Sequence, residues 1–211
     1  PNMMTREGAR GQEYNAWSGD GGNPPDHTTI LPFTRLLGGP MDFTPGIFDL
    51  TFEHANRPDN RVNTTLAKQL ALYVVLYSPL QMAADLPEHY KDEPAFQFIK
   101  DVPVDWETTL VPHGEIGDYV VIVRKDRNSD DWYIGGITDE NERELTIELF
   151  FLDKNKQYAA TIYSDGQEAH WKDNPYSLDI KNTMLKRTDK LTLHLAAGGG
   201  QAIRITPENQ Y

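Results

Sequence analysis

Residues 119–137 read Y-V-V-I-V-R-K-D-R-N-S-D-D-W-Y-I-G-G-I, which is the pattern of two β-strands joined by a polar turn. Both ends of the stretch are rich in β-branched and aromatic residues, whereas residues 126–131 between them are charged or small. This arrangement is typical of antiparallel strands, in which successive side chains point to opposite faces of a sheet. The stretch therefore predicts a β-sheet in the second half of the chain.

The same strand pattern continues to the end of the chain. Turn-forming residues such as Ser164-Asp165-Gly166 separate the apolar runs. Short strands at this spacing predict an antiparallel β-sandwich domain over residues 108–211, which we expect to fold as an independent unit because it can close its own core. The seven expected strands cover residues 119–123, 132–137, 145–152, 158–163, 178–180, 191–195 and 202–205.

Residues 1–107 have a different composition, with many glycines and prolines and one strong helix signal. Apolar residues recur at helical spacing from Leu66 onward and predict an amphipathic helix that Pro79 ends. Asn63 or Thr64 is the expected N-cap of this helix.

Further elements are expected before that helix. Residues 41–43 form an apolar run between prolines and predict a short buried strand, which ends in a loop before a second apolar patch at 47–52. Residues 28–37 are expected to be helical, with a proline just inside the start and glycines at the end. The order of strand, loop and helix is that of an α/β barrel unit, so residues 1–107 are expected to belong to a barrel.

The overall charge narrows the possible partners. The 211 residues carry 32 acidic and 20 basic side chains, for a formal net charge of −12. A nucleic-acid partner is not expected, because phosphate binding needs a basic surface, whereas neutral or cationic ligands such as calcium remain open. Insertion into a membrane is not expected either, since no stretch approaches the roughly 20 apolar residues of a membrane span. The absence of cysteine excludes disulfides and thiolate metal sites.

The densest group of chemically useful residues is T-R-E-G-A-R-G-Q-E-Y-N-A-W at 5–17. Glycines between Glu7 and Glu13 allow the backbone to turn and bring the two carboxylates together. Such a pair suits calcium, which takes several oxygen ligands, and it equally suits glycosidic cleavage, which needs a protonated acid beside an ionised partner. A purely structural alternative is that Glu7 forms an ion pair with Arg6 or Arg10 in a solvated loop.

Aromatic residues next to the carboxylates are typical of a sugar site. Tyr14 and Trp17 can stack on the apolar faces of pyranose rings, although either could equally be a core residue. His27 follows in a predicted loop end, where it could donate to a substrate hydroxyl or cap the next helix. Asp42, inside an apolar run, would need a partner if buried.

The chain closely resembles glycoside hydrolase family 97 in four runs: residues 5–17, N-P-P-D-H-T-T-I-L-P-F-T-R at 23–35, G-P-M-D-F-T-P-G-I-F-D-L at 39–50, and A-K-Q-L-A-L-Y-V-V-L-Y-S-P-L-Q-M-A-A-D at 67–85. The resemblance implies a parent with an N-terminal β-supersandwich, a central (β/α)8 barrel and a C-terminal β-domain. The expected fold class is therefore the last two units of a TIM barrel (residues 1–107) followed by an antiparallel β-sandwich (108–211).

By position in the family motif, the resemblance implies that Glu13 is the general acid and that Glu7 is a Ca²⁺ ligand, with Glu13 as a further ligand. Tyr14, Trp17 and His27 are the expected substrate-binding residues. The remaining ligand and the base or nucleophile are expected upstream of Pro1. The expected partners are therefore an oligosaccharide substrate and the missing N-terminal part of the same polypeptide, without which the isolated fragment is expected to be inactive.

The family contains inverting α-glucosidases and retaining α-galactosidases. The motifs look most like the starch-utilisation enzymes of gut Bacteroidetes, which favours an exported α-glucosidase in the periplasm or outside the cell. A noncatalytic carbohydrate-binding module is an alternative, with an aromatic platform built from Trp132, Tyr133, Tyr163 and Trp171. Trp132 and Tyr133, however, should point to opposite faces. A metal-dependent hydrolase of esters or phosphates is a further alternative, but histidine clusters and a G-x-S-x-G motif are missing.

Overall fold

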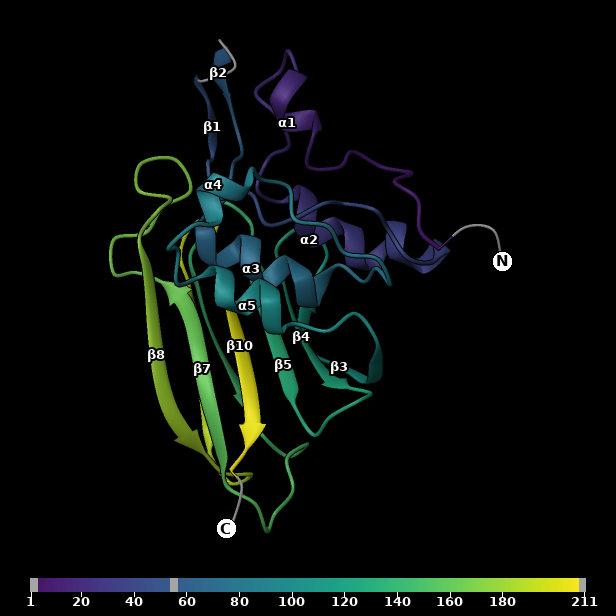
Figure 1. Cartoon of the computed structure of the whole chain (residues 1–211), viewed down its shortest axis with the longest axis vertical. Helices are drawn as coiled ribbons and strands as arrows, with labels where there is room; N and C mark the ends of the chain where they lie inside the picture. The colour runs from purple at the N-terminus through teal and green to yellow at the C-terminus, as the bar shows by residue number, and fades with distance from the viewer. Residues whose placement is uncertain (1–3, 54–56, 209–211) are drawn as a thin grey trace.

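The computed structural model describes residues 4–53 and 57–208. Figure 1 shows an antiparallel β-sheet domain with short helices packed across one face of the sheet. The helices and 3-10 turns are α1 Tyr14–Trp17, α2 His27–Ile30, η1 Leu31–Phe33, η2 Arg35–Gly38, α3 Leu66–Val75, α4 Pro87–Tyr90 and α5 Phe96–Asp101. The strands are β1 Thr51–Phe52, β2 Arg57–Arg61, β3 Trp106–Glu115, β4 Tyr119–Asp126, β5 Trp132–Thr138, β6 Arg143–Glu148, β7 Tyr158–Asp165, β8 Leu178–Leu185, β9 Lys190–Leu195 and β10 Gly200–Pro207.

The seven predicted strands are confirmed as β4 to β10, although the strand expected at 145–152 ends at Glu148. Six strands form one antiparallel sheet in the order β3-β4-β5-β10-β7-β8, and β6 pairs with β9 in a separate sheet. Strand β3 was not predicted. It contains Pro112 and its pairing with β4 shifts register twice, features that are tolerated at the edge of a sheet and that weaken the sequence signal of a strand.

Strand β5 lies inside the large sheet and is buried on both faces. Trp132 and Ile134 join the core beneath β6 and β9, whereas Tyr133 and Ile137 join the core beneath α3. The prediction that Trp132 and Tyr133 point to opposite faces is therefore confirmed. Gly135 lets the helix approach closely, since a Cβ atom there would lie 2.7 Å from the backbone oxygen of a residue in α3.

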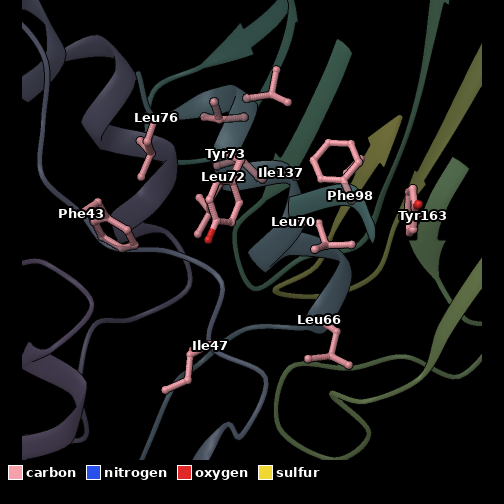
Figure 2. Close-up of a cluster of buried hydrophobic side chains, with 14 of the residues drawn as sticks. Phe43, Ile47, Leu66, Leu70, Leu72, Tyr73, Leu76, Phe98, Ile137 and Tyr163 are labelled. Atoms are coloured by element: carbon pink, nitrogen blue, oxygen red, sulfur yellow. The ribbon is translucent and has the colours of Figure 1, made fainter. Parts of the chain in front are cut away.

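The predicted helix is confirmed as α3, but its amphipathic interpretation is wrong, because all ten of its residues are buried. Figure 2 shows the reason: side chains of α3 lie between Phe43 and Ile47 of the preceding loop on one side and Ile137, Phe98 and Tyr163 on the other. The N-cap is also different from the prediction. It is Thr65, whose side chain accepts a hydrogen bond from the backbone of the third residue of the helix, rather than Asn63 or Thr64.

Lys68 ties α3 to its neighbours from inside the core. The side chain is 1% exposed, and its Nζ donates to the backbone oxygens of Pro25 and Thr138 at 2.7 Å each. Burial lowers the pKa of Lys68 to about 8. The two carbonyl contacts satisfy a group that would otherwise be costly to bury, and they join the Pro24-Pro25 loop and β5 to one helix.

The expected elements before α3 are only partly regular. The helix expected at 28–37 is broken into α2, η1 and η2, because Pro32 lacks the N–H that a continuous helix would need. The strand expected at 41–43 is reduced to a single parallel bridge between Met41 and Arg6.

The two halves of the chain share one core. Strand β3 begins at Trp106, close to the predicted domain boundary between residues 107 and 108, and that boundary stays a prediction. The cluster under α3 contains residues from both sides of it, including Leu50 and Tyr163. In the part of the chain that the structure describes, no helix is long and apolar enough to cross a membrane.

Candidate active site

The loop between Arg6 and α1 brings the two predicted carboxylates together. The backbone N–H of Gly11 donates to Oε1 of Glu7 at 3.0 Å, and the Glu7 carboxyl lies close enough to Glu13 to raise the pKa of Glu13. Gly11 leaves room for the Glu13 carboxyl, because a Cβ atom at position 11 would lie 2.7 Å from Oε2 of Glu13. The predicted convergence of Glu7 and Glu13 thus has a clear local cause.

The environment of Glu13 favours its protonated form. Partial burial raises the pKa of Glu13, and the neighbouring Glu7 carboxyl and the negative charge of Asp42 raise the pKa further. A raised pKa is the direction of shift that proton donation by a carboxylic acid requires.

Arg35, which the sequence did not point out, holds this loop in place. Its guanidinium donates to the backbone oxygens of Glu7 and Arg6 at 2.7 Å each, and to those of Gly39 and Pro40 at 3.0 and 3.1 Å. One planar side chain therefore joins the loop that carries Glu7 to the segment before Met41. The contacts with Glu7 and Arg6 join residues 28 and 29 positions apart, which leaves no spacing signal in a sequence, so only the fold reveals this role.

The predicted aromatic residues lie on α1 next to the carboxylates. Trp17 is 59% exposed, and its ring stands edge-on to that of Tyr14, with 5.3 Å between the centroids. The Tyr14 hydroxyl donates to Asp20 at 2.7 Å, and the Arg10 guanidinium lies 4.5 Å from the centroid of the Tyr14 ring. Trp17 consequently presents an open aromatic face, whereas Tyr14 is engaged on one face and at its hydroxyl.

His27 faces the same loop from α2. Its Nε2 lies 2.9 Å from the backbone oxygen of Arg10, an acceptor, so that nitrogen carries the proton. Burial lowers the pKa of His27, which favours the neutral ring. Arg10 itself forms an exposed ion pair with Asp20 at 3.9 Å. The observed contact of His27 supports the loop, and a contact with substrate stays a prediction.

The fit of a calcium ion can be judged from the same residues. Among residues 4–53 and 57–208, no group of three or more histidine, aspartate or glutamate side chains could hold a metal ion. Glu7 and Glu13 nevertheless present two oxygen-bearing side chains side by side, with mutual repulsion that a divalent cation would relieve. These two residues fit a calcium site that further oxygen ligands would complete.

We expect Gly11→Ala to impair any activity of Glu13 without unfolding the protein. The added methyl group would meet the end of a flexible side chain, so the Glu13 carboxyl would move while the backbone stays in place. A displacement of about 1 Å can lower catalysis roughly 10²-fold. The measurement is turnover by the full-length protein alongside its melting temperature. Gly19→Ala is the matched control, because a Cβ atom there would have no neighbour within 4 Å.

Comparison with known proteins identifies the family of this chain. A family model described as glycosyl-hydrolase 97 C-terminal, oligomerisation, matches residues 105–206. A retaining α-galactosidase of Bacteroides thetaiotaomicron is 36% identical over 209 residues, covering 97% of this chain and 31% of that protein. A probable retaining α-galactosidase of Streptomyces bingchenggensis is 36% identical over 137 residues, covering 64% of this chain and 19% of that protein.

Solved structures extend the similarity to the whole described fold. A glycoside hydrolase family 97 enzyme from Pseudoalteromonas sp. strain K8, in complex with acarbose, is 56% identical with a TM-score of 0.93 over 99% of this chain and 32% of that one. The same match holds for its variant in complex with panose. This chain thus spans about a third of the length of the enzyme from strain K8. The chain belongs to glycoside hydrolase family 97 and corresponds to the C-terminal portion of its members.

Proposed function

We propose that this chain is the C-terminal part of a calcium-dependent α-glucosidase that acts on starch-derived oligosaccharides, with Glu13 as the general acid. The observation that carries the proposal is the position of the Glu13 carboxyl beside Glu7, where partial burial and the neighbouring carboxyl raise the pKa of Glu13. Loss of a sugar leaving group requires that proton on the glycosidic oxygen. The proposed outcome is inversion, with the base supplied by the remainder of the polypeptide.

The surrounding residues have roles that follow from their positions. Trp17 offers an exposed ring on which a pyranose can stack, Tyr14 borders it, and His27 completes the substrate-binding set. Glu7 and Glu13 would hold the calcium ion, whose charge would favour the developing negative charge on substrate oxygens.

The placement of these residues agrees with the last two units of a (β/α)8 barrel, which is also part of the proposal. The parallel bridge between Arg6 and Met41 is the pairing expected of two neighbouring barrel strands. In barrels, catalytic residues lie on the loops that follow the strands, and Glu7 to Glu13 directly follow Arg6. The helix α3 comes after Met41, in the order of strand, loop and helix.

The choice of an α-glucosidic substrate is supported by the enzyme from strain K8. It is 56% identical to this chain and binds panose, a sugar built from α-linked glucose, and acarbose. The second candidate is a retaining α-galactosidase, since the two curated relatives carry that name at 36% identity. A noncatalytic sugar-binding module is disfavoured, because Trp132, Tyr133 and Tyr163 are buried. The proposal includes export of the protein to the periplasm or secretion from the cell.

The test uses the full-length protein with maltose, panose and an α-galactoside, with and without a calcium chelator. We expect hydrolysis of the two glucosides, loss of activity on chelation and recovery when calcium is returned. NMR of the first product should show β-glucose, the mark of inversion. Preferred cleavage of the α-galactoside with an α-configured product would instead support the second candidate, and no turnover of any glycoside would overturn both.

A further inference from the structure

A chain of buried amide groups runs from α3 to the loop that carries Glu13. Oε1 of Gln69 accepts hydrogen bonds from Nε2 of Gln12 at 2.8 Å and from the backbone N–H of Gly46 at 2.9 Å. The backbone oxygen of Gln12 in turn accepts from Nδ2 of Asn15 at 2.9 Å, and Oδ1 of Asn15 accepts from the backbone N–H of Asn23 at 2.7 Å. Gln69, Gln12, Asn15 and Asn23, which we call the amide chain, are all buried.

The amide chain holds the backbone on both sides of Glu13. Gln12 precedes Glu13, and its backbone N–H also donates to the oxygen of Phe43 at 2.9 Å. Nδ2 of Asn23 donates to the oxygen of Gly11 at 2.9 Å. Buried hydrogen bonds of this kind have defined geometry and are costly to leave unmade. Glu13 is therefore the exposed residue of an otherwise fixed turn.

Gln69 fixes one end of the amide chain, because the helix α3 that carries Gln69 is itself held in place by packing. Every residue of α3 is buried, and the adjacent Lys68 joins the helix to β5 through the oxygen of Thr138. The sheet, α3 and the turn around Glu13 thus form one continuous packed path. We propose that Gln69 is a positioning residue, which sets the place of the Glu13 carboxyl for proton donation; this inference rests on the proposed function.

The two contacts of Gln69 allow a sharp test, since both use Oε1. Gln69→Leu removes the acceptor and keeps a side chain of similar size. Gln69→Glu keeps an acceptor for Gln12 and Gly46, and so serves as the conservative rescue. Gln81→Leu is the matched control, because Gln81 donates to the backbone oxygen of Leu76, just beyond the C-terminal end of α3.

The experiment measures kcat and KM of the full-length variants with maltose and with an aryl α-glucoside. For Gln69→Leu we expect kcat on maltose to fall about 10- to 100-fold, the size of a misplaced catalytic group, with a smaller fall on the aryl glucoside. Gln69→Glu should recover most of that loss, and Gln81→Leu should behave as the parent. A general weakening of the fold would instead lower kcat equally on both substrates, and Gln69→Glu would not restore it.

Gln12→Met is the second variant, for use if Gln69→Leu does not fold, because it breaks the same hydrogen bond from the other side. Equal losses on both substrates, or full activity of folded Gln69→Leu, would overturn the positioning role. Glu13→Gln, measured in parallel, separates this failure from that of the proposed function. If Glu13→Gln retains activity on maltose, Glu13 is not the acid and the proposed function fails.

Discussion

Replacing Glu13 by Gln in the full-length enzyme should lower kcat on maltose by roughly 10²- to 10⁴-fold, the usual contribution of a general acid. The amide has nearly the shape of the carboxyl and cannot supply the proton that a sugar leaving group requires. An aryl α-glucoside should be affected much less, because a phenolate leaves without full protonation. The ratio of the two losses is the measured quantity, and it distinguishes a missing proton from a damaged site.

Glu7→Gln provides the contrast within the same pair. If Glu7 holds calcium, its loss weakens metal binding, and activity should recover at least partly as calcium is raised, by mass action. Added calcium should not restore Glu13→Gln on maltose. Glu144→Gln is a suitable control, since Glu144 is an exposed partner of His194 in the β-domain. Equal losses on both substrates for Glu7→Gln and Glu13→Gln, with no response to calcium, would contradict the separate roles.

The second large effect concerns the β-domain without α3. A fragment of residues 105–211 should not unfold cooperatively, because it exposes the sheet face that α3 covers, including Val120, Ile122 and Ile137. At about 1.5–3 kcal/mol for each fully buried side chain, uncovering these three costs roughly 5–9 kcal/mol. That is on the order of the whole net stability of a domain. The sequence pattern suggested an independent unit, and the packing gives a reason to expect the opposite.

Thermal unfolding followed by near-ultraviolet circular dichroism, together with binding of an apolar dye, measures this effect. The fragment should show a weak, broad transition and strong dye binding, while residues 1–211 serve as the control with the sheet covered. A sharp transition of the fragment at the temperature of the intact chain would show that the β-domain closes its own core and that α3 is dispensable.

The local sequence pattern was sufficient to predict those helices and strands whose formation depends on their own residues. Seven strands and α3 were predicted from alternation, helical spacing and turn residues, because those periods reflect which side chains are buried. Strand β3 was missed because an edge position tolerates Pro112 and bulges. The broken helix at 28–37 was mispredicted because the effect of Pro32 on a continuous hydrogen-bond ladder outweighed the surrounding propensities.

For the site, the sequence by itself determined the residue types, the glycines that let Glu7 and Glu13 meet, and the resemblance to family 97. Only the tertiary structure decided that Arg35 clamps the loop and that Gln69 supports the turn around Glu13 from a buried helix. The contact between Arg35 and Glu7 spans 28 positions of the chain, and the contact between Gln69 and Gln12 spans 57 positions. A hydrogen bond between distant residues depends on how whole elements pack, and it leaves no periodic trace in the order of amino acids.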